Sequence, residues 1–508
     1  MTHWIMAPVL LPMFAAAFIV FMARRNPGLA GLVSFTATCL LALMTLVLMG
    51  IAVDEGYRVY TLGGWPAPFG IVLVLDRLSA LMLLLTATLA LASLAHALAV
   101  NEPSSSTFHV LFQFQIMGLN GAFLTGDLFN LFVFFEILLA ASYGLLLAGG
   151  GRDRVRAALH YVIVNLVGSL IFLIALGVIY GTIGTLNMAH MAERVAGLSG
   201  SDLTLLRAGA LMLLVVFALK AAALPLYLWL PATYSSATAA VAGLFALMTK
   251  VGAYSIIRVF STGFGGADNP VIEMIQDWML PVALATIVFG AIGALSCDTL
   301  RRLAAYLVIV SVGTLLVALA IPGADALAAA LYYMVHSTLL GAAMFLVADL
   351  IAASRGAVTD RLLESGPRIQ QEGVLGSIFF VVAIALAGMP PLSGFIGKAM
   401  ILSSALGDAQ WAWVLGIVLV TSLLTIVALS RAGSQLFWKT QGEAAPAAQV
   451  NGDRLLPAGG LALVSPLLVV FAGSVDDYMS DTAKRLLDPT EYIERVLEQG
   501  RDAMGGYR

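Results

Sequence analysis

Charged residues are scarce in this chain. Asp, Glu, Lys and Arg make up only 11% of its 508 residues, whereas a soluble domain carries about 25%. Hydrophobic residues make up 60%, and the mean hydropathy is +0.97. This composition excludes a soluble protein with a single anchor and predicts a polytopic membrane protein. The net charge of −3 provides no basic excess, so nucleic acid is not an expected partner.

Cysteine is almost absent. Cys39 and Cys297 are the only two, and both lie in or beside apolar segments. Without a Cys-x-x-Cys motif or a Cys/His cluster, the chain lacks the ligands of an iron–sulfur centre, a c-type haem or a structural zinc site. We therefore expect no cofactor and no metal site. The N-terminal apolar run also lacks a basic region and a small-residue cleavage site, so it is predicted to be a membrane helix rather than a signal peptide.

Long apolar runs fill most of the chain. About 20 apolar residues suffice for a helix to cross a bilayer. Fourteen such helices are predicted, so the expected fold class is an all-α polytopic membrane protein. Their expected ranges are about 4–23, 29–53, 70–99, 108–125, 128–149, 156–183, 205–230, 236–261, 271–296, 302–321, 325–351, 373–405, 411–438 and 456–474.

Lysine and arginine are distributed unevenly between the predicted loops. With the N-terminus outside, thirteen fall on the cytoplasmic side and three on the outer side. Positive loop residues favour the cytoplasm, so both termini are expected on the outer side of the inner (plasma) membrane. The tail at 476–508 holds five more, which count against this orientation although nearby acids balance them.

The tail contains an amphipathic pattern. Tyr492, Val496 and Leu497 recur at helical spacing in PTEYIERVLEQGRDAM. This pattern predicts a short helix lying at the membrane surface, and a disordered tail is the alternative.

Four charged residues lie deep in apolar segments: Glu136, Lys220, Lys250 and Lys398. A charge at the bilayer centre costs roughly 2.5–3.5 kcal/mol, and such residues usually mark a proton or ion path. His336 lies near the middle of another apolar helix and titrates near physiological pH. Together, the five residues predict a proton path, in which Lys220 is the expected charge partner of Glu136. A coordinated sodium ion is less favoured because Glu136 is the only deep carboxylate, although carbonyls at broken helices also offer ligands.

Each of these residues has a structural alternative. An ion pair of Glu136 and Lys220 would also pin two helices together, and Lys250 would also be stable if bonded to carbonyls. Similarly, His336 has the pattern of a satisfied core histidine, and Lys398 is placed where it could reach the outer interface. Several further polar residues are predicted to order water or to bond between helices, namely Tyr161, Asn165, Ser169, Tyr254, Ser311 and Tyr333.

Two of the lysine-bearing helices are interrupted by proline. Pro225 and Pro231 follow Lys220, and Pro390 and Pro391 precede Lys398. Proline breaks the helical hydrogen-bond ladder, and a membrane tolerates the break only where protein or a wet cavity satisfies the freed groups. The breaks fall in predicted helices 7 and 12, five apart, as two five-helix repeats would place them.

Several long motifs resemble a known family in order along the chain: GDLFNLFVFFEILLAASYGLL, LKAAALPLYLWLPATYSSATAAVAGLFALMTKVGAY, DTLRRLAAYLVIVSVG and AGMPPLSGFIGKAMIL. They are similar to the antiporter-like subunits shared by respiratory complex I, membrane-bound hydrogenases and Mrp-type multisubunit Na⁺/H⁺ antiporters, from Asp76 to about Trp438. Within this family, TGDLFNLFVFFEILL and Lys398 are most similar to the D-type subunits of Mrp antiporters. The resemblance implies fourteen helices with two inverted five-helix repeats, helices 4–8 and 9–13. It also implies a central polar axis on Glu136, Lys220, Lys250, His336 and Lys398.

The same resemblance implies a division of the chain. Residues 1–107 would hold the first three helices, 108–262 and 263–440 the two repeats, and 441–508 the last helix and the tail. The chain departs from the family pattern at Leu340, where many relatives have a lysine four residues after the histidine. The implied role of His336 is therefore the least supported of the five.

The resemblance leads to three hypotheses. The first is a proton-translocating subunit of a monovalent cation (Na⁺)/proton antiporter, a transporter rather than an enzyme, assembled in the bilayer with other antiporter subunits. The second is a proton-pumping subunit of a redox complex such as NADH:quinone oxidoreductase or a membrane-bound hydrogenase. The third is a scaffold whose charges only align helices.

Overall fold

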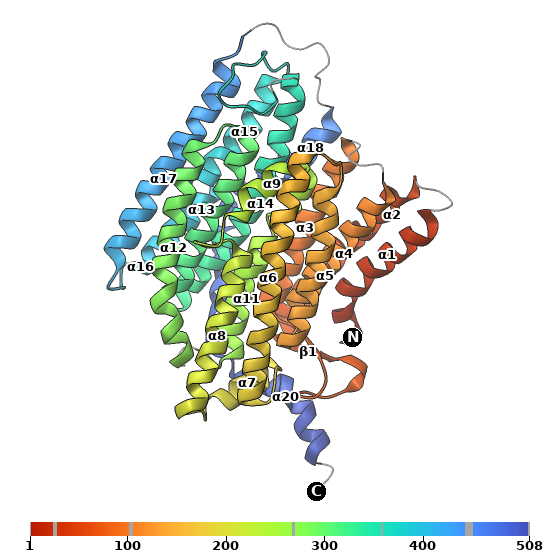
Figure 1. The fold of residues 1–508 in the computed structure, drawn as a ribbon, viewed down its shortest axis with the longest axis vertical. Helices are drawn as coiled ribbons and strands as arrows, with labels where there is room; N and C mark the ends of the chain where they lie inside the picture. The colour runs from red at the N-terminus through yellow and green to blue at the C-terminus, as the bar shows by residue number, and fades with distance from the viewer. Residues whose placement is uncertain are drawn as a thin grey trace.

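The structure is a computed structural model that describes residues 2–23, 28–100, 105–266, 270–356, 359–441 and 451–505. Helices dominate every part of it (Figure 1). Their bounds are α1 (Ala7–Ala23), α2 (Leu29–Glu55), α3 (Arg77–Ala99), α4 (Ser106–Leu124), α5 (Leu128–Leu147), α6 (Arg152–Ile183), α7 (Met188–Val195), α8 (Gly200–Ala221), α9 (Trp229–Ser236), α10 (Ala239–Phe245), α11 (Met248–Ile257), α12 (Pro270–Ser296), α13 (Leu300–Ala320), α14 (Ala324–Arg355), α15 (Glu372–Ala387), α16 (Ser393–Ala405), α17 (Trp411–Gly433), α18 (Gly452–Val470), α19 (Ala472–Leu487) and α20 (Thr490–Gly505).

Twelve helices in the described ranges are long and apolar enough to cross a membrane, which confirms the polytopic helical architecture. One of these spans, Ala239–Gly263, joins α10, α11 and the short η3 (Arg258–Gly263). Two of the fourteen predicted helices are not among the twelve. One is α4, which carries three buried amides, and the other is the predicted helix at 373–405, which is divided into α15 and α16.

A small hairpin is an exception to the predicted all-α class. Strands β1 (Arg58–Thr61) and β2 (Val72–Leu75) pair antiparallel, with Arg58 opposite Leu75. The predicted helix at 70–99 therefore begins only at Arg77. Asp76 fixes this start, because its carboxylate accepts a hydrogen bond of 2.8 Å from the Ser79 amide while Ser79 Oγ accepts one of 2.8 Å from the Asp76 amide.

Both predicted breaks are confirmed. In the first, α8 ends at Ala221, Ala222 adopts a φ of 61°, and the chain reaches α9 through Pro225. In the second, α15 ends at Ala387 and Gly388 takes a φ of 80°, a conformation that glycine adopts without strain. Each break therefore leaves a half-helix terminus inside the protein.

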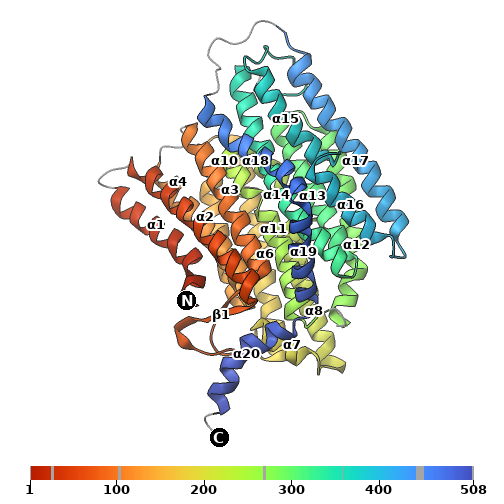
Figure 2. The ribbon, with the colours of Figure 1, turned by 180° about the vertical axis from the view of Figure 1, so that it is seen from behind.

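Helix α14 forms the centre of the molecule. It is buried on nearly all sides, as expected of a helix that is apolar all round. It packs against α10, α13, α16, α18 and α19. Helices α1 and α2 lie at one edge and α17 at the other, and α18 and α19 cross the face seen in Figure 2.

One end of the molecule carries the hairpin, α7 and α20 (Figure 1). The short η1 (Thr2–Met6) packs on β1 and β2, and α20 packs on α7 and β1, so both ends of the described chain meet here. The predicted amphipathic tail helix is confirmed as α20. Its apolar residues Tyr492, Val496 and Leu497 are at most 4% exposed, so protein, rather than the predicted membrane surface, covers this face.

Candidate functional site

Glu136 and Lys220 are connected through one turn of α6. Ser169 Oγ donates a hydrogen bond to the Glu136 carboxylate, and Lys220 Nζ donates one of 2.9 Å to Asn165 Oδ1. Asn165 and Ser169 are four residues apart and so lie on one face of α6. In the described residues, the predicted direct ion pair of Glu136 and Lys220 is not formed. Two neutral side chains of α6 stand in its place.

A cavity of about 10 Å³ lies beside Lys220 and Asn165. Its lining also includes Tyr161, Trp229 and Val251. This volume is about that of one water-sized probe. Val251 directly follows Lys250, so the cavity borders α11, the helix that carries the second lysine.

Lys250 joins the two halves of the chain. Its side chain is fully buried, and its Nζ donates a hydrogen bond of 3.0 Å to Ser311 Oγ on α13. Ser311 Oγ in turn donates to Val308 O at 2.7 Å. In the described residues, the Lys250 amine is therefore bonded to a hydroxyl rather than to a backbone carbonyl.

His336 lies on α14 with 1% of its surface exposed. Its Nδ1 is 2.8 Å from Ser393 Oγ, at the start of α16, and Ser393 Oγ is 2.7 Å from Ser465 Oγ on α18. The imidazole therefore ends a chain of two hydroxyls that connects three helices. Serine both donates and accepts, so this chain can accommodate either tautomer of the ring.

Lys398 lies at the second break. Its Nζ donates hydrogen bonds of 2.9 Å to Ala387 O and to Ser422 Oγ on α17. Ala387 ends α15, and the carbonyl end of a helix attracts positive charge. The side chain is 7% exposed, so it does not extend to the outer interface. Here the break supplies an acceptor that a continuous helix would have used itself.

The five predicted residues lie on five different helices, α5, α8, α11, α14 and α16. Within the described ranges, no hydrogen bond or ion pair joins any two of them. Nor do three His, Cys, Asp or Glu residues lie close enough there to hold a metal ion. We call these five residues the polar axis: Glu136, Lys220, Lys250, His336 and Lys398.

Sequence reasoning identified part of the shell around the polar axis. Asn165, Ser169 and Ser311, predicted to bond water or neighbouring helices, each bond directly to one of its members. Ser393, Ser422 and Ser465 were not identified, because their partners come from other helices and the sequence does not show which helices face each other.

Gly394 controls how α16 fits against α15 and α14. A Cβ at this position would lie 1.9 Å from Ala385 O and 3.0 Å from His336 Nε2. We expect Gly394→Ala to destabilise the protein by about 1–3 kcal/mol, as overpacking does. Thermal unfolding of the purified protein measures this. Gly407→Ala is the matched control, since a Cβ there meets nothing within 4 Å. Equal unfolding temperatures for the two variants would contradict the fit described here.

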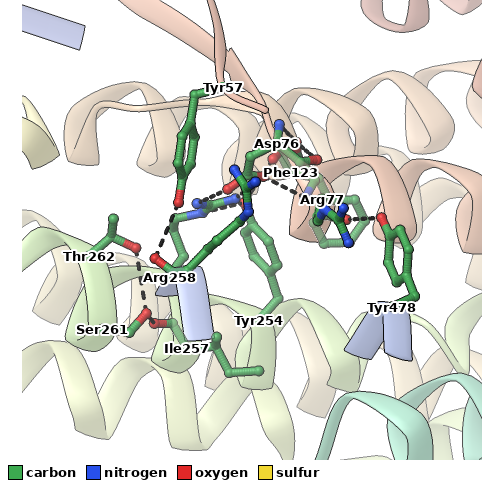
Figure 3. Close-up of polar contacts among 12 residues, drawn as sticks. Tyr57, Asp76, Arg77, Phe123, Tyr254, Ile257, Arg258, Ser261, Thr262 and Tyr478 are labelled. Atoms are coloured by element: carbon green, nitrogen blue, oxygen red, sulfur yellow. Dashed lines mark hydrogen bonds and ion pairs between the residues drawn. The ribbon is translucent and has the colours of Figure 1, made fainter. Parts of the chain in front are cut away.

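Arg258 is a buried charge that the sequence analysis missed. It is 2% exposed, and its Nη1 and Nη2 donate hydrogen bonds of 2.6 and 2.7 Å to the two oxygens of Asp76 (Figure 3). Its Nε donates to Tyr254 Oη at 3.1 Å, and Tyr254 Oη donates to Phe123 O at 2.7 Å. Lys250, Tyr254 and Arg258 recur every four residues, and this spacing is the signal that could have revealed the arginine.

Two further segments close over the Arg258–Asp76 pair. Tyr57, between α2 and β1, donates a hydrogen bond of 3.2 Å to Arg485 O, and Tyr478 of α19 donates one of 2.7 Å to Arg77 O. Burial raises the pKa of the Tyr57 hydroxyl above its usual value, so the group stays a donor. The tail is therefore tied to the end of α3 beside the buried pair.

Residues 125–425 match the family described as NADH:quinone oxidoreductase/Mrp antiporter, TM. The D subunit of a probable K⁺/H⁺ antiporter of Rhizobium meliloti is 42% identical, over 98% of each chain. The D subunit of a Na⁺/H⁺ antiporter of Bacillus subtilis is 35% identical, over 98% of this chain and all of that protein. In the structure of the Mrp complex from Dietzia, one chain superposes with a TM-score of 0.87 at 27% identity, covering 98% of this chain and 100% of its own.

Proposed function

Because this chain belongs to the NADH:quinone oxidoreductase/Mrp antiporter family, as a D-type subunit of an Mrp antiporter and so a transporter component, we propose that its polar axis is the proton path of a monovalent cation/proton antiporter. The path runs through Glu136, Lys220, Lys250, His336 and Lys398. It places one carboxylate, three amines and one imidazole in series across five helices.

One observation carries this proposal. Each of the five ionisable groups is held by a hydroxyl, an amide or a carbonyl of a neighbouring helix, and none is locked to a counter-ion in the described residues. A salt bridge favours the charged state of both partners, whereas a hydroxyl donates or accepts as required. Lysine is suited to such a relay because its amine can lose and regain a proton, which arginine effectively cannot do.

The arrangement of the chain as two inverted repeats is part of the proposal. Residues 108–262 and 263–440 would each supply five of fourteen helices, preceded by residues 1–107 and followed by 441–508. The breaks between α8 and α9 and between α15 and α16 support it, since they fall at corresponding places in the two halves and each adjoins a lysine. Paired broken helices are typical of sites at a repeat interface.

We place both termini on the outer side of the inner (plasma) membrane. The end that carries η1, the hairpin and α20 then faces outward, and the Arg-rich loops face the cytoplasm. The expected partners are the other antiporter subunits. The names of the two relatives differ in the cation, K⁺ in one and Na⁺ in the other, and Na⁺ is the cation we propose for this chain.

Cation-dependent proton exchange in everted vesicles tests the function. In vesicles with the whole complex, adding Na⁺ or K⁺ should collapse a preformed pH gradient. Glu136→Gln keeps the shape of the side chain but removes its titration, so exchange should fall by at least about tenfold. Glu364→Gln is the control, because that acid is 54% exposed and paired only with Arg361 in the described residues.

Three results would decide against the proposal. Full exchange by an assembled Glu136→Gln complex would remove this residue from the path. If assembly falls while exchange per complex is unchanged, the charges only align helices. Copurification of flavin and iron–sulfur subunits, in place of small antiporter subunits, would instead indicate a redox complex.

A further inference from the structure

A second cluster of ionisable residues lies at the end opposite the Arg258–Asp76 pair. It brings together His96 on α3, Arg301 on α13 and Asp349 on α14. His96 Nε2 is 3.2 Å from Asp349 Oδ2, and Arg301 Nη2 donates a hydrogen bond of 2.8 Å to Asp349 Oδ1. In the proposed orientation this end faces the cytoplasm.

Exposure changes steeply across this cluster. The Asp349 and Arg301 side chains are 21% and 29% exposed, whereas His96 has no exposed surface. The carboxylate is therefore reached from water on one side and touches a fully buried imidazole on the other. An imidazole placed in this way can take a proton at one nitrogen and release one from the other.

Two buried polar atoms continue inward from His96. Its Nδ1 and Ser93 Oγ are both buried without a hydrogen-bond partner in the described residues. Ser93 is three residues before His96, so it lies on the same face of α3, about 4.5 Å deeper. Buried polar atoms without partners are rare in proteins, and ordered water commonly satisfies them.

Ser93 lies against α10, which precedes α11 and Lys250, and near α14, which carries His336. A Cβ on Gly243 of α10 would lie 3.1 Å from Ser93 Oγ and 3.9 Å from Ala342 Cβ of α14. Lys250 is seven residues below Gly243, or about 10 Å, and His336 is six residues from Ala342, or about 9 Å. A short chain of waters covers such a distance at about 2.8 Å per hydrogen bond.

We infer that Asp349 and His96 form the site where the polar axis takes up protons from the cytoplasm, with Arg301 as the residue that positions Asp349. This inference rests on the proposed function. Asp349 accepts a proton from water and passes it to His96 Nε2 while the Nδ1 proton leaves toward Ser93. One proton enters and one leaves, and reorientation or tautomer exchange of the neutral ring completes the cycle.

His96→Ala tests this inference in the same vesicle assay, with and without added imidazole. Exchange should fall by at least about tenfold, and imidazole should restore it several-fold by replacing the missing ring. His109→Ala is the matched control. That histidine is also buried, at 5% exposure, and its Nδ1 is also without a partner in the described residues, but no acid is paired with it there.

The other outcomes separate the inference from the function. Normal exchange in His96→Ala, or a loss that imidazole does not restore, overturns the uptake site and leaves a merely structural tie. Lys250→Ala is measured in parallel, and normal exchange in that variant would overturn the proposed proton path itself. If His96→Ala does not assemble, Asp349→Asn replaces it, since it keeps the shape of the acid; there, loss of exchange supports the uptake site and full exchange overturns it.

Discussion

Replacing Lys220 by alanine is expected to lower cation/proton exchange by roughly 100-fold or more while the complex still assembles. Lys220 is 6% exposed, and its amine is hydrogen-bonded to Asn165. In the proposed path, the Lys220 amine takes up the proton between Glu136 and Lys250, so its removal interrupts the path at this point. The measurement is the initial rate of gradient collapse per assembled complex in everted vesicles.

Lys220→Arg separates proton transfer from charge alone. Arginine keeps a positive charge and several donors but effectively never gives up its proton. If Lys220 relays protons, the arginine variant should be as inactive as the alanine variant, and high exchange in it would contradict the relay. Lys439→Ala is the control, because Lys439 is exposed and lies outside the helices that carry the polar axis.

Breaking the buried Arg258–Asp76 pair is expected to have the largest effect on stability. Removal of one partner leaves the other charge buried and alone, which costs about 3–5 kcal/mol. Asp76→Ala and Arg258→Ala should therefore each lower the unfolding temperature of the purified protein strongly. The double variant Asp76→Ala/Arg258→Ala should be more stable than either single variant, because no unpaired charge remains.

Arg361→Ala provides the control for that experiment. It breaks an ion pair with Glu364 whose two side chains are 55% and 54% exposed, and such pairs contribute at most about 1 kcal/mol. A similar small shift in Asp76→Ala would mean that the buried pair does not anchor the fold. A double variant as unstable as the sum of the singles would contradict the role of the unpaired charge.

Features that depend on a single segment could be predicted from the sequence. Composition located the membrane helices, because a span is a property of about 20 consecutive residues. Proline located both breaks, because its effect on the helical hydrogen bonds is local. Glu136, Lys220, Lys250 and Lys398 stood out because each interrupts such an apolar run, although buried Arg258 was missed. The hairpin did not, since Val72–Leu75 is a short apolar run that periodicity alone does not distinguish from the start of a helix.

Features that depend on which helices face each other could not be predicted. The sequence suggested Lys220 as the partner of Glu136, yet each bonds to a different side chain of α6. For the same reason the sequence contained no sign of Ser465, which bonds to Ser393 from 72 residues further along the chain and is connected to His336 only through Ser393. Tertiary packing decides such contacts, and a single sequence contains no record of it.

The tail and His96 illustrate a further limit. The period of Tyr492, Val496 and Leu497 predicted a helix, but an apolar face looks the same whether lipid or protein covers it. His96 lies near the end of a predicted helix, where a histidine gives no signal of its own. Only its contact with Asp349, 253 residues later in the chain, marks His96 as a candidate functional residue.

The turn of α6 that connects Glu136 and Lys220 also affects how fast these two residues can change hydrogen-bond partners. The carboxylate and the amine are held by the side chains of Ser169 and Asn165, so either hydrogen bond can break and re-form by side-chain rotation. Rotamer changes take picoseconds to nanoseconds when side chains are free to move, whereas helix displacements take microseconds or longer. If Glu136 and Lys220 begin the proposed proton path, their exchange of hydrogen-bond partners should therefore be faster than any step that moves a helix.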